Sequence, residues 1–375
     1  MDEVLTAAVR DRASDVHFEP FEEEFQVRRR IDGAFQLLPP PPVPPAPVIS
    51  RLKVLGGLDI AERRRPQDGR ISLRIGERAI DLRISTLPTQ TGESVVLRVL
   101  DPDAARHGLR TLGLPAELEA SIGRAVRRPH GLVLVTGPTG SGKTTTLYAC
   151  LDLVNSSDTK ILTVEDPVEY EVEGPVQVSI NPAAGLTFGR ALRSFLRQDP
   201  DIILVGEIRD SETAQIAVQA ALSGHLVLST LHTNDAVGAI ERLVDLEVEP
   251  FLLASTVQAV LAQRLLRRVC PHCRRLVPAT SLGVLPELMG TDFAGRTVPV
   301  AVGCAQCEGS GYRGRLALFE WFEVSEAAKA MIAGRAAPRE LRACARAGGL
   351  VPLRDVALRL VFEGSTTLDE LLRYT

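Results

Sequence analysis

The stretch that decides the fold runs from Leu132 to Thr144 and reads LVLVTGPTGSGKT. Its apolar start is typical of a buried strand, and the pattern from Thr145 to Leu153 is typical of a helix. A glycine-rich loop between a strand and a helix can wrap its backbone amides around a triphosphate. Lys143 can then reach the β- and γ-phosphates, and the Thr144 hydroxyl can hold Mg²⁺. The predicted nucleotide-binding residues are Gly137, Pro138, Thr139, Gly140, Ser141, Gly142, Lys143, Thr144 and Thr145.

Composition narrows the class of protein. The 375 residues suffice for two or three domains, and 45% hydrophobic with 24% charged residues is typical of a soluble globular protein. A net charge of −4 and 4% aromatic residues argue against nucleic acid as the main partner. No apolar run reaches the length of a membrane span, and the first residues are not a signal peptide. We therefore expect a cytoplasmic protein that contacts a membrane through partners alone.

The chain divides by pattern. Residues 1–103 mix short alternating segments with one helical stretch near 48–58, which predicts a small α+β domain. Beyond a linker at 104–114, apolar strands alternate with helical patterns over 115–265, which predicts an α/β domain with a parallel sheet covered on both faces. Residues 266–320 hold two cysteine pairs, and residues 321–375 are predicted to be helical.

Acidic residues follow two of the predicted strands. Glu207 ends the segment DIILVGE, in which Gly206 replaces the usual terminal Asp, so Glu207 is the acid in reach of Mg²⁺ or the attacking water. Glu165 and Asp166 precede Pro167, which forces an extended turn at the carboxyl edge of the sheet, where ligands bind in such folds. A solvated loop at the strand end is the equally weighted alternative for this second pair.

Two histidines bracket another predicted strand. His225 precedes residues 226–231 and His232 follows them, with Thr230 and Thr233 adjacent. Such histidines can sense a γ-phosphate. A structural role is the alternative, and the residues by themselves favour it slightly.

Four cysteines form two CxxC pairs, Cys270 with Cys273 and Cys304 with Cys307, separated by 30 residues. Four thiolates in two such pairs give a closed tetrahedral Zn²⁺ site, which is structural because no coordination position stays open. In a reducing compartment this arrangement favours metal over disulfides, and a redox dithiol is the alternative.

A longer run of motifs resembles one family. The stretch Leu192–Asp210 is similar to the signature of the secretion-superfamily ATPases, which power type II secretion and type IV pilus assembly. The segments Ser223–Asn234 and Leu261–Leu265 continue this similarity, and Leu58–Gly69 and Arg83–Pro88 resemble the family's second N-terminal domain. The likeness covers nearly the whole chain.

The resemblance implies a fold, an assembly and roles for particular residues. It implies a PAS-like N-terminal domain and a RecA-like P-loop motor domain, with ATP in the cleft between them and six chains in a ring. Glu207 would be the catalytic acid, and Arg83 and Arg98 would reach the γ-phosphate from the N-terminal domain. Glu165 and Asp166 match the family's aspartate box, and His225 and His232 match its histidine box. Arg209 is a weaker candidate for a further arginine at the site.

The sequence therefore predicts a Mg²⁺-dependent ATPase that drives pseudopilus assembly for type II secretion, docked on inner-membrane platform proteins. Pilus assembly is the near alternative, and the cysteine pairs argue against the pilus-retraction branch. The chain starts almost at its Ala13-Ser-Asp-Val-His17 motif, so we expect the extra membrane-docking domain of full-length members to be absent or removed. Two further alternatives remain. A nucleic-acid translocase is disfavoured by the negative net charge of the chain. A scaffold that binds ATP without hydrolysing it is disfavoured by the intact Lys143, Thr144 and Glu207.

Overall fold

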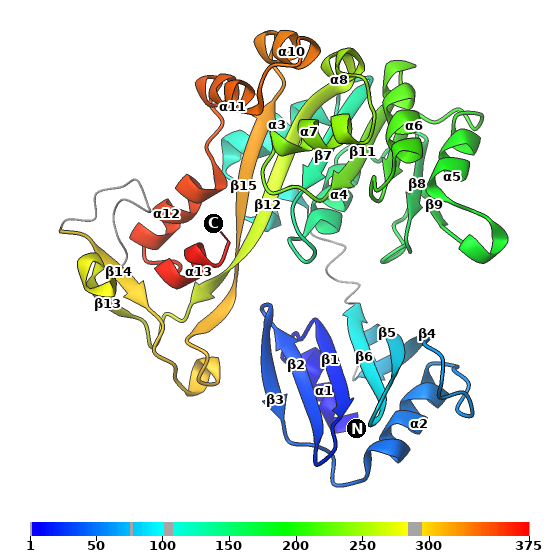
Figure 1. The fold of residues 1–375 in the computed structure, drawn as a ribbon, viewed down its shortest axis with the longest axis vertical. Helices are drawn as coiled ribbons and strands as arrows, with labels where there is room; N and C mark the ends of the chain where they lie inside the picture. The colour runs from blue at the N-terminus through cyan, green and yellow to red at the C-terminus, as the bar shows by residue number, and fades with distance from the viewer. Residues whose placement is uncertain (1, 76–77, 101–107, 284–294, 375) are drawn as a thin grey trace. The chain divides into compact units, whose positions relative to one another are not determined.

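The structure is a computed structural model that describes residues 2–75, 78–100, 108–283 and 295–374. It separates into two compact units, Met1–Ala104 and Ala105–Thr375, each with its own sheet and core (Figure 1). Each unit is described by itself below.

The first unit is built on a six-stranded sheet in the order β3-β2-β1-β6-β5-β4, in which all neighbouring strands are antiparallel. Its elements are α1 (Asp2–Arg10), β1 (Asp15–Pro20), β2 (Phe25–Ile31), β3 (Ala34–Leu38), α2 (Pro45–Leu55), β4 (Gln67–Ile75), β5 (Arg78–Thr89) and β6 (Gly92–Leu100). The strands alternate apolar and polar residues, so the apolar face packs on α1 and α2. This is the small α+β arrangement that the alternation predicts.

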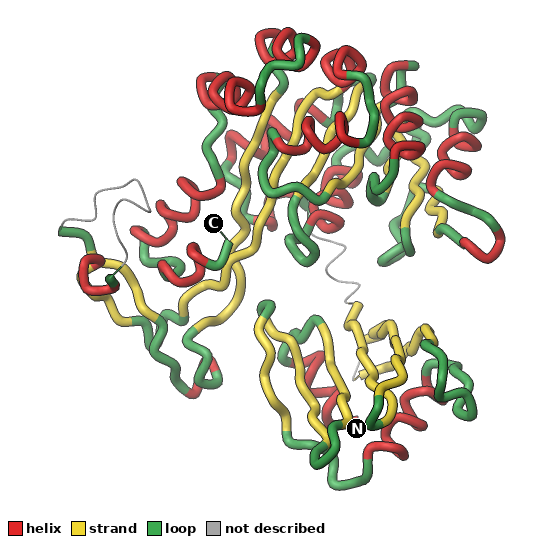
Figure 2. Tube along the Cα trace, in the orientation of Figure 1, coloured by secondary structure: helices red, strands yellow, loops and turns green. Residues whose placement is uncertain are grey.

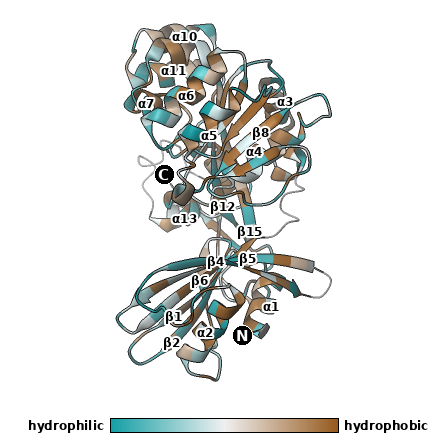
Figure 3. Ribbon diagram, turned by 90° about the vertical axis from the view of Figure 1, so that its right-hand side faces the viewer, coloured by the Kyte–Doolittle hydropathy of each residue, from teal (hydrophilic) through white to brown (hydrophobic). Residues whose placement is uncertain are grey.

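The second unit contains a seven-stranded sheet in the order β15-β12-β7-β11-β10-β8-β9. Its strands run parallel except β15, which pairs antiparallel with β12. The strands are β7 (Gly131–Thr136), β8 (Ile161–Glu165), β9 (Val176–Ser179), β10 (Ile202–Val205), β11 (Leu226–Leu231), β12 (Val257–Val269) and β15 (Tyr312–Glu323). Most are apolar without alternation, because helices cover both faces; Figure 3 shows β8 and its neighbours largely in brown.

The two faces of this sheet bury different strand residues. Leu132 and Leu134 pack into the core on one face, and Val133 and Val135 pack into the core on the other. Figure 2 shows helices on both sides of the strands. The first face carries α5 (Phe188–Phe195), α6 (Ser211–Leu222), α7 (Gly238–Asp245), α8 (Pro250–Thr256), α10 (Glu326–Ala333) and α11 (Pro338–Ala347), and the second carries α3 (Ala116–Ala125) and α4 (Lys143–Asp152).

The cysteine-bearing segment is continuous with this sheet. Strands β12 and β15 pair from Ala259 with Glu323 out to Val269 with Tyr312, and they extend past the central strands in Figure 1. A third core joins their far ends to the remaining elements: β13 (Arg275–Pro278), β14 (Thr297–Val300), α12 (Leu353–Phe362) and α13 (Leu368–Leu372). The sequence places boundaries at 265/266 and 320/321, but both fall inside paired strands, so this part is not a separate compact unit.

Three further expectations concern the linker, the C-terminal region and membrane-spanning helices. The linker expected at 104–114 lies partly outside the described residues, and its later part forms the turn η2 (Leu109–Leu112) against the α3/α4 core. The region after residue 321 is helical, as predicted, once β15 has ended at Glu323. Within the described ranges, no helix is both long and apolar enough to cross a bilayer.

Candidate functional site

The phosphate loop lies between β7 and α4, as the sequence predicts. Gly137, Gly140 and Gly142 adopt positive φ angles of +146°, +78° and +87°, which favour glycine strongly. The loop ends at the start of α4, where backbone N–H groups lack partners within the helix and the helix dipole favours an anion. The Oγ atom of Ser141 is buried and has no hydrogen-bond partner among the residues that the structure describes. These features fit the binding of a phosphate chain.

Lys143 starts α4 and folds against the loop. Its Nζ donates hydrogen bonds to the carbonyls of Gly137 (2.8 Å) and Pro138 (3.0 Å). Burial lowers the pKa of Lys143 to about 8, while the negative charge of Glu207 raises it and the positive charge of Arg264 lowers it. Lys143 is therefore flanked by one acid and one further cation.

Glu207 follows β10 at the same edge of the sheet. Its carboxylate pairs with Arg209 (Nη2–Oε1, 2.6 Å) and lies 3.4 Å from Nε2 of His232. The preceding Gly206 lies against β8, because a Cβ atom there would come within 3.3 Å of the Glu165 backbone. A Cβ atom at 206 would therefore require β8 to shift by a few tenths of an ångström, and the first acid after β10 is Glu207.

The structure separates the two histidines. His232 follows β11 at the carboxyl edge and approaches Glu207, whereas His225 precedes β11. The Nδ1 atom of His225 lies 3.0 Å from the carbonyl of Ala220, beside the end of α6. Roughly 23 Å of strand lies between the two histidines. The position of His225 therefore does not agree with the expectation that both histidines of one chain act at the same phosphate.

A threonine pair ties the loop of His232 to the phosphate loop. Thr136, the last residue of β7, lies 2.7 Å from Thr233 between their hydroxyl oxygens, and its Oγ1 also accepts a hydrogen bond from the Thr233 amide at 2.9 Å. The segment after β11 is thereby held beside the start of the phosphate loop.

Glu165 and Asp166 have different surroundings. Glu165 is 3% exposed and accepts hydrogen bonds from Tyr148 of α4 and from Thr163 (2.6 Å). The burial of Tyr148, together with the charge of Glu165, raises the pKa of this phenol. Asp166 is more exposed, and its Oδ2 lies 3.7 Å from Arg209. Glu165 thus connects β8 to the helix that follows the phosphate loop.

Arg83 and Arg98 lie in the first unit on neighbouring strands. They are direct partners across β5 and β6, so their side chains share the sheet face opposite the helices. Arg98 forms an ion pair with Asp15 of β1 (Nε–Oδ1, 3.2 Å), and its side chain is 55% exposed. The structure therefore brings the two predicted arginines together on one surface.

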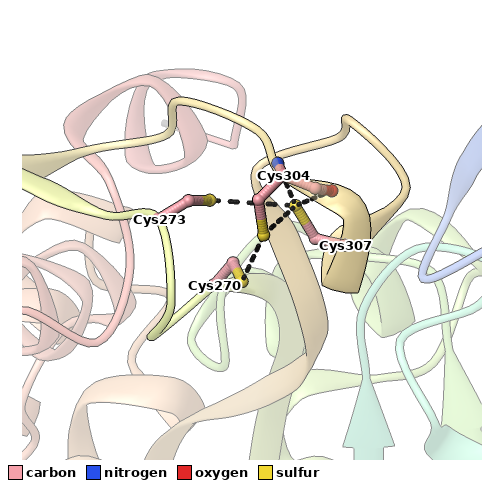
Figure 4. Close-up of side chains that lie close together, drawn as sticks. All are labelled: Cys270, Cys273, Cys304 and Cys307. Atoms are coloured by element: carbon pink, nitrogen blue, oxygen red, sulfur yellow. Dashed lines mark hydrogen bonds between the residues drawn. The ribbon is translucent and has the colours of Figure 1, made fainter.

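The four cysteines converge at the far ends of β12 and β15 (Figure 4). The Sγ atoms of Cys270 and Cys304 are 4.0 Å apart, those of Cys273 and Cys307 are 3.8 Å apart, and those of Cys304 and Cys307 are 3.7 Å apart. A tetrahedral zinc–thiolate site with bonds of about 2.3 Å requires sulfur separations of about 3.8 Å. All six cysteines of the chain are free thiols.

Backbone amides support this cluster. The amides of Cys304 and Gly311 each donate to Sγ of Cys307 at 3.2 Å, and the amide of Gly303 donates to Sγ of Cys273 at 3.3 Å. Burial raises the pKa of the Cys307 thiol, but the hydrogen bonds from the Cys304 and Gly311 amides and from the neighbouring thiols outweigh it and lower the pKa to about 6. The four residues therefore fit a metal ion that binds thiolates.

Two contacts beside the candidate site were not predicted from the sequence motifs. Gln263 of β12 accepts a hydrogen bond from the Thr146 hydroxyl (2.7 Å), and Arg264 donates to Oδ1 of Asn234 (3.0 Å). The available signal was a pair of polar residues inside the otherwise apolar stretch 259–266 of β12, a stretch that matched the family motif without a role for either residue.

A parallel sheet with a phosphate loop, a lysine and an acid at its carboxyl edge defines a P-loop nucleotide-binding protein. The model of the family described as "Type II/IV secretion system protein" matches residues 1–373, and the chain belongs to this family.

The relatives in this family are similar over nearly the whole chain. The chain is 52% identical to the Pseudomonas aeruginosa type II secretion system protein HxcR, over 99% of this chain and 76% of that protein. It is 48% identical to the Vibrio cholerae type II secretion system ATPase E, over 99% and 74%. Among solved structures it is similar to the pilus retraction motor PilT with bound ADP (25% identity, TM-score 0.67, 100% and 96% covered). The Legionella pneumophila ATPase DotB shares the fold (21%, TM-score 0.73, 100% and 94%).

Proposed function

We propose that this chain is the motor ATPase of a type II secretion system and hydrolyses ATP to drive pseudopilus assembly and protein export. The observation that carries the proposal is about 50% identity to type II secretion proteins over 99% of the chain, together with the convergence of Lys143, Glu207 and the phosphate loop. The family covers both type II and type IV systems, and the named relatives cited above favour type II.

In the proposed reaction, water attacks the γ-phosphorus and the bond to the β–γ bridging oxygen breaks, giving ADP and phosphate. Residues 137–145 hold the triphosphate, and Lys143 contacts the β- and γ-oxygens. The Thr144 hydroxyl would hold Mg²⁺, which would neutralise charge on the transferred group. Glu207 positions the water, and we propose that His232, 3.4 Å from Glu207, contacts the γ-phosphate or this acid. Glu165 acts through Tyr148 by fixing α4.

Arg83 and Arg98 complete the proposed site from the first unit. Two guanidinium groups on one sheet face can approach the γ-phosphate when this unit closes on the nucleotide, and release on hydrolysis couples chemistry to domain rotation. We propose that six copies form a ring in the cytoplasm and dock on inner-membrane platform proteins. Cys270, Cys273, Cys304 and Cys307 hold a structural Zn²⁺ ion in this proposal.

A phosphate-release assay tests the proposed site. The unaltered chain should hydrolyse ATP in the presence of Mg²⁺. Lys143→Ala should abolish hydrolysis without loss of fold, and Glu207→Gln should lower kcat by about 100-fold or more while nucleotide still binds. Turnover retained in Lys143→Ala would overturn the assignment of the phosphate loop.

Two further experiments separate the alternatives. Complementation of secretion-deficient and pilus-deficient strains distinguishes type II secretion from pilus assembly, because restored export without restored pili supports the first. Filter binding with single- and double-stranded DNA at low salt tests the translocase alternative, for which tight salt-sensitive binding would be required.

A further inference from the structure

Strand β12 lies beside β7 and carries two buried glutamines. Gln258 lies next to the amino end of β7, and Gln263 lies next to its carboxyl end. Ala262 pairs with Thr136, so the next residue, Gln263, is level with the first glycine of the phosphate loop. Gln263 is 3% exposed. A buried amide has four hydrogen-bonding positions, so its contacts show what holds it there.

Gln263 contacts both ends of the loop. A Cβ atom on Gly137 would come within 2.3 Å of the Gln263 carbonyl, and one on Gly142 would come within 2.9 Å of its Nε2. The side-chain Oε1 accepts a hydrogen bond from the fully buried hydroxyl of Thr146, inside the first turn of α4 (2.7 Å). The backbone of Gln263 therefore lies against the start of the loop, and its side chain supports the end of the loop and the helix that follows.

We infer that Gln263 is a positioning residue that holds the phosphate loop in its nucleotide-binding conformation. The inference rests on the proposed nucleotide site and adds a residue to it that does not touch the nucleotide. Without the contacts of the Gln263 side chain, a loop with three glycines at positive φ can adopt many conformations, and nucleotide binding must then order the loop. Because ATP and ADP both use this loop, the loss should weaken both, and kcat should change little.

The chain offers a matched control at the other end of β7. Gln258 is also buried on β12 (8% exposed), and its side chain packs against Gly131, where a Cβ would come within 2.5 Å. It accepts a hydrogen bond from Arg128, outside the phosphate loop. Gln258 thus has the same residue type, strand and neighbouring strand as Gln263, but it contacts the amino end of β7.

The experiment compares Gln263→Met with Gln258→Met in the full chain. Methionine keeps the length of the side chain and removes its hydrogen bonds. We expect the Kd for ADP and the KM for ATP to rise by about tenfold in Gln263→Met, with kcat within about twofold of the unaltered chain. In Gln258→Met both constants should remain unchanged, whatever its melting temperature. Unchanged ADP affinity in Gln263→Met, or equal weakening in both variants, would overturn the inference.

Thr146→Val tests the contact itself. It should weaken ADP binding in the unaltered background and add little in the Gln263→Met background, because both changes remove the same hydrogen bond. Full additivity of the two losses would contradict a shared contact.

Hydrogen exchange gives a readout independent of turnover. Amides of residues 137–146 should exchange faster in Gln263→Met than in Gln258→Met in the chain without added nucleotide. Equal exchange there would overturn the inference even if the chain proved unable to hydrolyse ATP. Absent hydrolysis by the unaltered chain would count against the proposed function alone.

Discussion

Burial and neighbouring charges act together on Lys143. Its ammonium is desolvated in the loop, faces the carboxylate of Glu207, and is repelled by Arg264. The result is a lysine whose pKa, at about 8, lies close to the pH at which an enzyme works. Phosphate oxygens beside the ammonium would favour its charged form and raise that pKa again.

This balance predicts that ADP affinity depends on pH. Below about pH 8 Lys143 is already protonated in the chain without nucleotide, so the affinity for ADP should be constant. Above about pH 8 the lysine must take up a proton when ADP binds, so the affinity should fall by up to about tenfold per pH unit. Calorimetric titration between pH 7 and 9.5 measures it. In Lys143→Arg the cation persists throughout, so the decline should vanish, and an identical decline there would assign it to another group.

Sequence patterns predicted this residue-scale site in part. Lys143, Glu207 and His232 lie at the carboxyl edge of the sheet as expected from motifs at strand ends. His225 does not, because a motif that includes both ends of a strand spans the two edges of a parallel sheet. Gln263 was missed because its partner Thr146 is distant in sequence, and no local pattern pairs them.

At the scale of elements, the paired strands β12 and β15 connect the nucleotide site to the cysteine cluster. Gln263 and Cys270 lie on or next to the same strand, one beneath the phosphate loop and one at the metal site. The region around β13 and β14 has a small apolar core, so a metal bound by four thiolates would supply much of its folding free energy.

Metal removal should therefore act locally. We expect about one zinc per chain by elemental analysis, and its loss in Cys307→Ser, with faster hydrogen exchange in β13 and β14 but not in β7. Cys344→Ser, a change outside the cluster, is the control and should keep the metal. Unchanged zinc content in Cys307→Ser would contradict the assignment.

A buried ion pair joins elements of the first unit. Lys53 of α2 is 1% exposed, and its Nζ contacts Glu93 of β6 (2.7 Å) and the carbonyl of Glu62 (2.5 Å). The lysine thus fastens the helix to the sheet and to the loop that precedes β4.

Removal of one partner should leave a buried charge. We expect Glu93→Leu to lower the free energy of unfolding of the first unit by about 3–5 kcal/mol, and Lys53→Met combined with Glu93→Leu to recover most of that loss. Denaturant unfolding of the full chain measures both. A double variant as unstable as the single one would show that the pair itself stabilises the unit.

At the scale of the whole molecule, the proposed function requires both units. Arg83 and Arg98 share one sheet face of the first unit, while the phosphate loop belongs to the second. In the proposed ring, hydrolysis depends on the approach of these arginines, whereas binding of ADP depends on the loop.

The two activities should therefore separate. We expect Arg83→Ala and Arg98→Ala each to lower kcat for ATP by about 100-fold or more and to leave the Kd for ADP within about twofold. Arg74→Ala, an exposed change on β4 of the same sheet, is the matched control and should leave both unchanged. Full turnover in the arginine variants, measured at a concentration where sedimentation shows the ring, would contradict their role.

The sequence by itself determined the class of both units, the phosphate loop and the set of four cysteines. These are local features: periodicity reports which faces are buried, and glycines and thiols at fixed spacing report a turn or a metal ligand set. Tertiary structure alone decided that β12 supports the phosphate loop through Gln263, that Glu165 faces Tyr148, and that His225 is remote from His232. Such contacts depend on strand order and register, which bring together residues far apart in the chain, and no local pattern encodes that order.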